Sequence, residues 1–354
     1  MGRLPGRLRP PQVNLVLQVL LVATVGTGLT SWAVGDAWNG WFARVHGVLG
    51  LSLLLLVPAK VRGPVRAGFR RRRRTRWISA GLGILALATV ALGVLHATGL
   101  WYGVGYWSAL WTHSLFGFAV TALLVWHLAS RPMRARVTDL DRRALLRTGV
   151  VAGAALGLYV TQETLTRATG LPGGRRRATG SHAVGSHDPA RMPEVIWLDD
   201  RRPAVTDEAT WPLVVGGATV TIASLRARAR PVVATLDCTG GWCSEQAWDA
   251  VPLSELLPAT ATARSVRVRS ATGYARSFAP DDLDRVHLAV GYGGAALRPG
   301  HGAPVRLVVP GRRGPWWVKV GDQRRARRDP ALAPAAPPPD LSRRAPPGVT
   351  PGPA

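Results

Sequence analysis

The sequence predicts a membrane α-helical bundle of about five transmembrane helices followed by an α+β domain. Two observations support this fold class: apolar blocks fill the chain to about residue 165, and mixed sequence with short β-rich runs follows them. The 354 residues are enough for two domains. We expect an N-terminal segment at 1–12, a five-helix domain at 13–165, a linker at 166–192, an α+β domain at 193–325 and a Pro, Ala and Arg tail without structure at 326–354.

Five apolar segments are each about as long as a crossing of the bilayer hydrocarbon requires. They cover residues 13–33, 41–60, 77–99, 108–130 and 148–165. The net charge of +25 comes from arginines in the loops between these segments, without the interleaved aromatic residues of a nucleic-acid surface. The expected partner is therefore the lipid bilayer and not nucleic acid. The arginine-rich and alanine-rich usage, with only Lys60 and Lys319 as lysines, is typical of a GC-rich bacterial genome.

The distribution of arginine predicts how the helices are oriented. An Arg-rich N-terminus, the run from Arg70 to Arg76 and the loop from Arg131 to Arg143 alternate with the loops 34–40 and 100–107, which carry no Lys or Arg. The positive-inside rule places the arginine-rich segments in the cytoplasm. With five crossings of the cytoplasmic membrane, everything after about residue 166 is then expected outside.

An arginine pair precedes the fifth apolar segment. Asp141, Arg142, Arg143 and the apolar residues after them resemble a twin-arginine export signal, which exports proteins already folded around a cofactor. The alternative is an ordinary basic loop beside a membrane helix. The position of the pair, directly before the second domain, favours export.

Histidines in the apolar segments predict a haem site, because ionisable side chains inside a membrane are costly and usually functional. His46 and His113 each lie about five residues from the outer end of their segment, so both rings are expected at one depth, where they can ligate one haem iron. His127 lies four turns, about 21 Å, further along the same helix face and suits a second haem. This arrangement resembles bacterial membrane cytochromes b.

Two residues leave alternatives open at the haem site. The position that would pair with His127 is occupied by Lys60, which is a poor haem ligand. His96, near the outer end of the third segment, is either another ligand of the upper haem or an interfacial histidine, and we favour the second reading. The alternative for His46 and His113 is a polar contact between packed helices.

The second half of the chain has the pattern of a compact mixed domain. Residues 171–192 are rich in Gly, Arg, Ser and His, so His182 and His187 are expected in solvent. Short β-rich runs follow, such as Leu213–Val215, Ser265–Arg269 and Val305–Val309. The only cysteines, Cys238 and Cys243, are too few for a disulfide framework and wrongly spaced for a zinc ribbon.

Three blocks of this half, in order, resemble the sulfite oxidase family. The first block comprises Thr235, Leu236, Asp237, Cys238, Thr239, Gly240, Gly241 and Trp242 with Trp248, Asp249, Ala250, Val251, Pro252, Leu253 and Leu256. The second comprises Gly273, Tyr274, Ser277, Phe278, Ala279 and Pro280. The third comprises Leu297, His301, Gly302, Pro304, Val305, Arg306, Leu307, Val308, Val309, Pro310, Gly311, Gly314, Val318 and Lys319. The resemblance implies a molybdopterin-binding oxidoreductase domain.

The resemblance also implies roles for individual residues. The Cys238 thiolate would bind molybdenum, a pairing that suits a soft ligand, and Gly240 and Gly241 would let the backbone approach the cofactor. Tyr274 would meet the substrate, or else be a core tyrosine. The molybdopterin contacts would be His301, Arg306 and Lys319, each of which can instead be an exposed turn residue. The resemblance gives Cys243 no role, so it is a packing residue or half of a local disulfide.

Two departures from the family put sulfite as the substrate in doubt. The chain ends in a tail instead of a dimerisation domain, and Val320 stands where the family has a tryptophan. Smaller bacterial relatives, including those that reduce oxidised methionine, are equally near. We therefore predict a membrane-bound enzyme that transfers oxygen atoms at molybdenum on a small-molecule substrate and exchanges electrons through haem b with a quinone or another carrier. The alternatives are the same enzyme with the helices as a plain anchor, and a membrane-anchored binding or assembly protein without catalysis.

Overall fold

The computed structural model describes residues 10–34, 40–70, 76–104, 107–130, 141–194, 208, 211, 213–257, 264–270, 273–319 and 332–334. The chain forms two compact units. The first comprises Met1–Trp197, Val233–Gln246 and Gly311–Pro315, and the second comprises Leu198–Val232, Ala247–Pro310 and Trp316–Ala354. The two short returning segments of the first unit belong to the range 193–325, which the sequence analysis assigned to the α+β domain.

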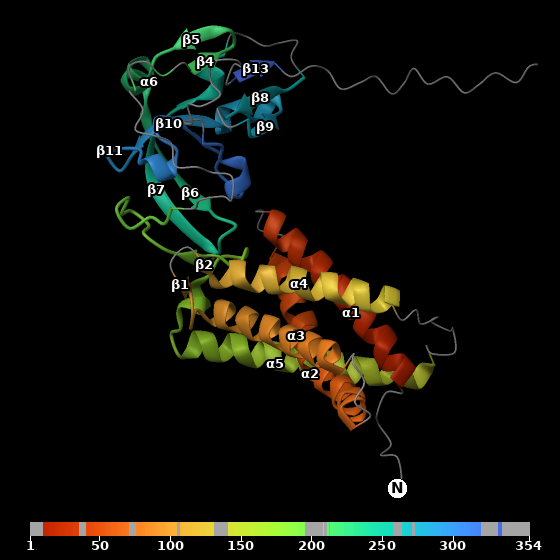
Figure 1. The fold of residues 1–354 in the computed structure, drawn as a ribbon. Coiled ribbons are helices and arrows are strands. Elements are labelled where there is room, and N and C mark those ends of the chain that lie inside the picture. Colours follow the sequence, from red (N-terminus) through yellow and green to blue (C-terminus); the bar gives the residue numbers. More distant parts are fainter. Residues whose placement is uncertain are drawn as a thin grey trace, which may run out of the picture. The chain divides into compact units, whose positions relative to one another are not determined.

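Five long helices make up most of the first unit (Figure 1). They are α1 (Pro10–Ala33), α2 (Gly40–Arg70), α3 (Arg76–Thr98), α4 (Ala109–Ser130) and α5 (Arg142–Ala168). Within the described residues, five stretches of these helices are apolar and long enough to cross a membrane, which agrees with the prediction. They are Gln12–Ala33, Gly40–Pro58, Ala80–Thr98, Ala109–His127 and Arg142–Ala168.

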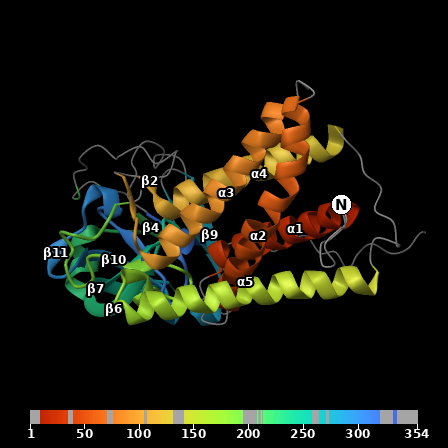
Figure 2. The same cartoon turned by 90° about the horizontal axis from the view of Figure 1, so that it is seen from below.

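The helices pack in sequence order, α1 on α2, α2 on α3 and α3 on α4, and α5 returns along α2 (Figure 2). Hydroxyl groups on these apolar helices bond back to the carbonyl four residues earlier, as Thr24 Oγ1 does to Leu20 O at 2.6 Å. Such bonds satisfy polar groups where a bilayer supplies no water. The arginine pair lies in the first turn of α5, where Asp141 caps the helix by accepting the Ala144 N–H at 2.6 Å.

The segment expected to be a solvated linker is folded in the structure. After α5 come the 3₁₀ turn η3 (Pro172–Arg175) and the short strand β3 (His182–Ala183), which pairs in parallel with the start of β7 (Trp242–Pro252). The prediction that His182 lies in solvent was wrong: the residue is buried, and its Nε2 donates to the His96 carbonyl at 2.8 Å. His187, by contrast, has a side chain that is 70% exposed. The first unit also holds the hairpin of β1 (Gly103–Val104) and β2 (Trp107–Ser108).

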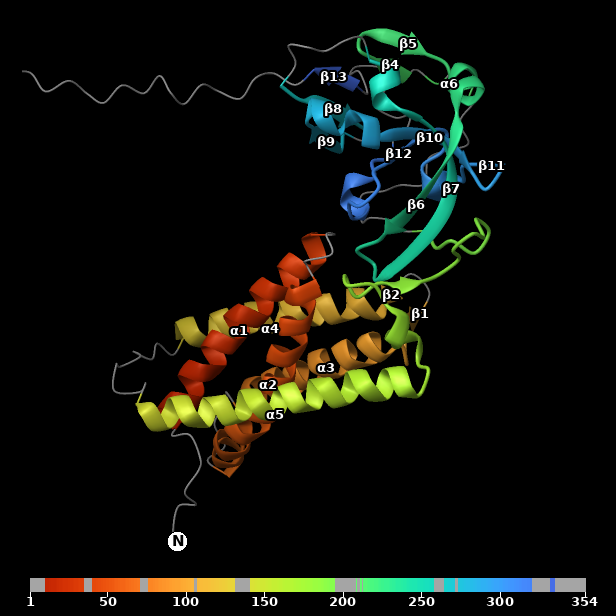
Figure 3. The same ribbon diagram turned by 180° about the vertical axis from the view of Figure 1, so that it is seen from behind.

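The second unit is built from short strands and turns (Figure 3). In it the end of β7 pairs with β10, which also pairs with β11 and β12, while β8 pairs with β9 and β4 with β5. The elements are β4 (Leu213–Val215), β5 (Ala218–Val220), α6 (Ile222–Arg228), η5 (Leu253–Glu255), β8 (Val266–Arg269), β9 (Ala275–Phe278), η6 (Pro280–Arg285), β10 (His287–Tyr292), β11 (Ala295–Ala296), η7 (Pro299–His301) and β12 (Arg306–Val308). All six residues of β10 are buried, so this strand is the centre of the core. The helical first part and the sheet-containing second part agree with the predicted fold class.

Several sequence predictions lie wholly or partly outside the described residues. They concern the N-terminal segment before Pro10, the arginines between 71 and 75, and the arginines between 131 and 140. Most of the predicted tail also lies outside them. Within that tail, Leu332–Pro334 forms the strand β13, which pairs antiparallel with β8.

Candidate functional site

The loop between β6 (Arg230–Asp237) and β7 carries Cys238, the residue that the sequence analysis singled out. The turn is closed by two backbone bonds, Cys238 N–H to Trp242 O at 2.8 Å and Gly241 N–H to Cys238 O at 3.2 Å. Gly241 has a φ of +86°, which only glycine adopts without strain, and an added Cβ would lie 2.8 Å from His96 Cε1. The Gly240 N–H donates to the Cys238 Sγ at 3.2 Å. The turn therefore presents a buried sulfur that already has one backbone donor.

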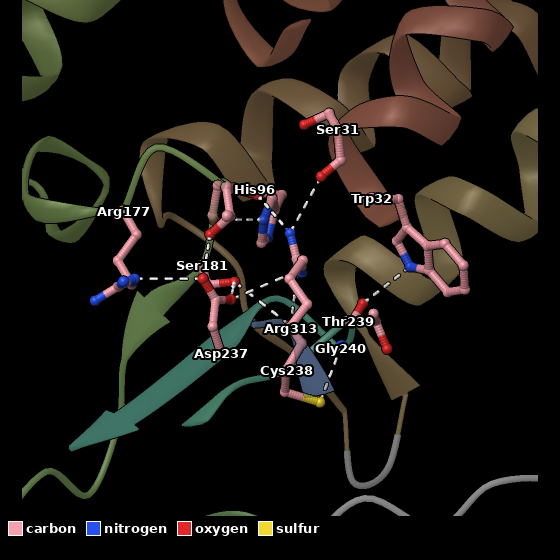
Figure 4. Close-up of polar contacts among 12 residues, drawn as sticks. Ser31, Trp32, His96, Arg177, Ser181, Asp237, Cys238, Thr239, Gly240 and Arg313 are labelled. Atoms are coloured by element: carbon pink, nitrogen blue, oxygen red, sulfur yellow. Dashed lines mark hydrogen bonds and ion pairs between the residues drawn. The ribbon is translucent and has the colours of Figure 1, made fainter. Parts of the chain in front are cut away.

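An ionic network centred on Asp237, the residue before Cys238, surrounds the backbone of this turn (Figure 4). The Asp237 carboxylate accepts hydrogen bonds from Thr179 Oγ1 and Ser181 Oγ, each at 2.7 Å. It also faces Arg177 Nε at 3.3 Å and Arg313 Nη2 at 3.6 Å. Arg313 Nη2 donates in addition to the Cys238 carbonyl at 2.9 Å. The carboxylate and the guanidinium together hold the cysteine backbone in one position.

The network also joins the β6–β7 loop that carries Cys238, here called the cysteine loop, to the helices of the same unit. Arg313 Nη1 donates to the Ser31 carbonyl near the end of α1 at 3.2 Å, and the Trp32 indole N–H donates to the Thr239 carbonyl at 3.2 Å (Figure 4). An added Cβ on Gly240 would lie 3.5 Å from the Trp111 indole nitrogen of α4. The cysteine loop therefore packs directly against α1 and α4.

Cys243 differs from Cys238 in its surroundings. Both are buried thiols, so the local disulfide considered for Cys243 is not formed. Burial, reinforced by the negative charge of Asp237, raises the pKa of the Cys243 thiol to about 11. A thiol with this pKa is almost entirely protonated at neutral pH and is therefore a poor nucleophile. Packing is therefore the role that the structure gives Cys243.

The helices enclose a cavity of about 870 Å³. A volume of this size falls within the range of cofactor and ligand sites, about 300–1,000 Å³. Its lining is mostly apolar, but it includes His46, His96, His113 and His127 and five arginines, Arg44, Arg167, Arg176, Arg177 and Arg313. Within the described residues no group of three or more His, Cys, Asp or Glu side chains could hold a metal ion. A haem iron differs in needing only two protein ligands.

His46 and His113 lie side by side in this cavity. Their ring centroids are 5.8 Å apart and their planes are nearly perpendicular, at 89°. His46 Nδ1 bonds to the Thr24 carbonyl at 2.9 Å, and His113 Nδ1 bonds to the Thr89 carbonyl at 2.8 Å. Because a carbonyl only accepts, each Nδ1 carries the proton, and each Nε2 keeps a lone pair. This arrangement of a carbonyl behind an imidazole is the usual support for a metal-ligating histidine.

Two glycines make room for these rings. A Cβ on Gly28 of α1 would lie 2.8 Å from His46 Cε1, and a Cβ on Gly93 of α3 would lie 3.1 Å from His113 Cε1. Any larger residue at either position would push its histidine aside. The sequence analysis expected these two histidines to come together, and the structure brings their rings within 5.8 Å, whereas their depth in a membrane and their ligation of haem stay predictions.

The structure joins His96 to the segment that follows α5, and both interpretations considered for His96 stay predictions. Its Nε2 bonds to the Gly180 carbonyl at 3.0 Å, and its ring contacts that of His182 with centroids 4.9 Å apart. The Nε2 proton is used in this bond, so Nδ1 is the ring nitrogen of His96 that keeps a lone pair. His96 therefore connects α3 to the 171–192 segment. His127 lines the cavity near the other end of α4.

The three residues expected to bind the pterin come together in the second unit. Arg306 is buried, donates to the His301 carbonyl at 2.8 Å and lies 5.8 Å from the rings of Trp248 and Trp317. It also forms an isolated backbone bridge with Lys319. The His301 Nδ1 lies 2.7 Å from the Tyr292 hydroxyl. These residues are therefore organised around one buried guanidinium.

Tyr274 lies in the turn before β9 and is 41% exposed, so it is not the core tyrosine of the alternative interpretation. The Arg276 guanidinium carbon lies 4.7 Å from the centre of its ring. Partial burial raises the pKa of the Tyr274 phenol, so the hydroxyl stays protonated at neutral pH. It can therefore donate a hydrogen bond to a ligand.

Sequence reasoning missed the residues that hold the cysteine loop. Thr179, Ser181 and Arg313 had no assigned role, and Asp237 was noted only as part of a block. The local sequence gives little sign of them, because the contacts join positions that are 56 to 282 residues apart. The one available signal was Arg313, which lies between Gly311 and Gly314 of the third block.

Comparison with known proteins concerns the second half of the chain. Residues 201–329 match the family model of the oxidoreductase molybdopterin binding domain. The match includes Cys238, Tyr274, His301, Arg306 and Lys319, and it excludes the five helices. None of the curated proteins matches the chain. The match supports a molybdenum-dependent oxidoreductase that uses the molybdopterin cofactor.

Proposed function

We propose that this chain is a membrane-bound oxidoreductase in which Cys238 binds the molybdenum of a molybdopterin cofactor and His46 and His113 bind a haem b. The molybdenum cofactor would supply oxygen-atom transfer on a small molecule, and the haem would supply one-electron exchange with a quinone or another carrier. The domain match supports the molybdenum cofactor. The histidine pair and its cavity support the haem.

The residues around Cys238 fit a molybdenum cofactor. The bound cofactor would supply the two-electron chemistry of oxygen-atom transfer. The Gly240 N–H stabilises negative charge on the Cys238 sulfur, so it favours the thiolate that a metal requires. Tyr274 offers its hydroxyl to the substrate. Arg306 and Lys319 would supply positive charge for the anionic groups of the pterin. The hydrogen bond between the Tyr292 hydroxyl and His301 Nδ1 fixes the His301 ring, whose other nitrogen would contact the polar edge of the pterin.

The observation that carries the proposal is the packing of the cysteine loop against the helices. Arg313 binds both the Cys238 carbonyl and the Ser31 carbonyl, and it also lines the histidine cavity. The molybdenum ligand and the proposed haem pocket therefore share one compact unit. If the helices were a plain anchor, neither the cavity nor a buried network between it and the cysteine would be needed.

The arginine distribution supports a location for this chemistry. The loops predicted to be cytoplasmic carry the arginines, so we propose that the domain after α5 lies outside the cytoplasmic membrane. The pair Arg142 and Arg143 at the start of α5 fits export of a domain already folded around its cofactor.

The experiment that tests the proposal is metal analysis and optical spectroscopy of the purified full-length protein in detergent. We expect about one molybdenum per chain and a reducible haem b band. Cys238→Ser should lose molybdenum and keep the haem, His113→Ala should do the reverse, and Cys243→Ser should keep both. Molybdenum without haem in the unaltered protein would reduce the helices to an anchor. Neither cofactor in fully matured protein would favour a binding or assembly protein instead.

A further inference from the structure

We infer that the cavity lined by His46 and His113 contains an anion site, in which Arg44 and Arg167 bind the carboxylates of the proposed haem. This inference rests on the proposed haem and adds the residues that orient its polar edge. The observations that carry it are the charge balance of the cavity wall and the exposure of these two guanidinium groups.

Basic and acidic side chains are unequally represented on the wall of this cavity. Among the described residues, the lining includes five arginines and a single acid, Glu163. Two of the arginines face the Asp237 carboxylate from the cysteine loop, and Arg176 pairs with Glu163. The excess positive charge is therefore carried by the other two arginines, Arg44 and Arg167.

The Arg44 guanidinium is open to a ligand without any rearrangement of the protein. Arg44 lies in the second turn of α2, and its side chain is exposed. Its guanidinium carbon lies 5.3 Å from the centre of the Trp41 ring, and no carboxylate in the described part of the chain pairs with it. A cation–π contact uses none of the five N–H donors of arginine. These donors are therefore left for an anion.

Arg167, in the last turn of α5, is similarly accessible. Its side chain is 70% exposed, and its ion pair with Glu163, one turn earlier, has a distance of 3.9 Å. Glu163 is held more closely by Arg176, which also donates to the Gly173 carbonyl at 2.7 Å. A long ion pair of an exposed side chain contributes little. Arg167 can therefore bind an anion without opening a buried contact.

Tyr159 of α5 shows that the two arginines converge. The charges of Arg44 and Arg167 both act on its hydroxyl. Its ring packs on α2, since a Cβ added to Gly47 would lie 2.7 Å from Tyr159 Cε2. Gly47 directly follows His46 in the chain, and all five residues line the cavity. The two guanidinium groups therefore gather beside the first of the proposed haem ligands.

The haem supplies a ligand of matching charge. Its ring suits the apolar part of the cavity, and it carries two carboxylates on one edge. A carboxylate at a guanidinium forms charge-assisted hydrogen bonds, which are often bidentate. Two carboxylates match the two accessible arginines, while Glu163 and Asp237 keep their present partners.

The test compares two forms of one ligand. Full-length apoprotein in detergent is titrated with ferric haem and with its dimethyl ester, which keeps the iron and the ring but has no carboxylates. We expect the unaltered protein to bind the ester about tenfold more weakly, the effect of losing one hydrogen bond to a charged group.

Variants then assign this difference to residues. Arg44→Gln and Arg167→Gln should each weaken the binding of ferric haem by roughly threefold, the range for an accessible ion pair. The double variant should bind the two ligands about equally. Arg175→Gln is the matched control, because Arg175 is exposed in the same region but lies outside the cavity lining. It should match the unaltered protein.

The outcomes separate this inference from the proposed function. If haem binds with the spectrum of two histidine ligands but the ester binds equally well, the inference is overturned and the haem site stands. If neither porphyrin binds, both are overturned. The comparison in the unaltered protein decides between these outcomes even if a variant does not fold.

A lipid phosphate is the other source of an anion for these arginines. Native mass spectrometry of the apoprotein with added phosphatidylglycerol measures whether lipid is retained. Retention that is lost in the double variant, together with equal binding of ferric haem and its ester, would assign Arg44 and Arg167 to a lipid headgroup and overturn the inference.

Discussion

Cys238 and Cys243 are two buried thiols, one in the β6–β7 loop and one in β7, whose surroundings differ. The Cys238 sulfur accepts the Gly240 N–H, a contact that favours the negatively charged form. Cys243 lies at the start of β7, where its surroundings and the negative charge of Asp237 hold the proton on sulfur. Neither sequence position nor exposure separates the two residues, because both are nearly fully buried. The difference lies in the donors and charges around each sulfur.

This difference predicts slow alkylation of Cys243. With a thiol pKa of about 11, only about one molecule in a thousand is the thiolate at pH 8. We expect native Cys238→Ser protein to react with iodoacetamide far more slowly than the unfolded protein, and the rate to rise as the pH approaches 11. Mass spectrometry of the modified peptide measures both. Rapid modification of the native variant at pH 8 would contradict the assigned pKa.

The histidine pair depends on how closely helices approach it. α1 and α3 each place a glycine against one ring, Gly28 against His46 and Gly93 against His113. An extra methyl group in a packed site costs about 1–3 kcal/mol. We therefore expect Gly28→Ala to weaken haem binding by about tenfold. A titration of the apoprotein with ferric haem measures the effect.

Gly26→Ala is the matched control, because a Cβ at Gly26 of the same helix meets nothing within 4 Å. Both substitutions raise the helix propensity of α1 equally, so only the contact with His46 distinguishes them. Unchanged haem affinity in Gly28→Ala, or an equal loss in Gly26→Ala, would show that His46 is not held in this way.

At the scale of elements, the sequence predicted what local pattern encodes. The five apolar segments became α1 to α5, and the runs at 213–215, 265–269 and 305–309 became β4, β8 and β12. The helix ends were less accurate, since α2 continues to Arg70 and α5 starts at Arg142. Hydropathy marks only the apolar part of a helix, whereas the backbone hydrogen bonds continue into polar sequence.

What could not be predicted depends on contacts between distant parts of the chain. β3 has two residues and exists only through its pairing with β7, so the polar sequence around it predicted a linker. His182 was assigned to solvent for the same reason. The cysteine itself could be predicted from its block, but its partner Arg313 could not, since a charge in a Gly-rich turn usually lies in solvent. Only the fold brings it to 0% exposure.

At the scale of the whole molecule, the arginine distribution predicts the topology, and single cysteines can test it. Val104 of β1 is 72% exposed and lies in the loop region without Lys or Arg, so it is expected outside. Ala135 belongs to the arginine-rich loop and is expected in the cytoplasm. In a chain with both native cysteines replaced by serine, Val104→Cys should react with a membrane-impermeant maleimide in spheroplasts. Ala135→Cys should react only after the membrane is opened.

The reasoning behind this expectation is energetic. Moving the arginine-rich loops outward would carry several cations across the hydrocarbon, at about 2.5 kcal/mol or more for each arginine near its centre. Val104 precedes α4 and Ala135 follows it. If α4 crosses the membrane, the two positions therefore lie on opposite sides of it, and the labelling of one predicts that of the other. Labelling of Ala135→Cys in closed spheroplasts, with Val104→Cys protected, would invert the whole topology and place the molybdenum domain in the cytoplasm. In that case the arginine pair of α5 would be a loop feature, and electrons would have to be exchanged with a cytoplasmic carrier.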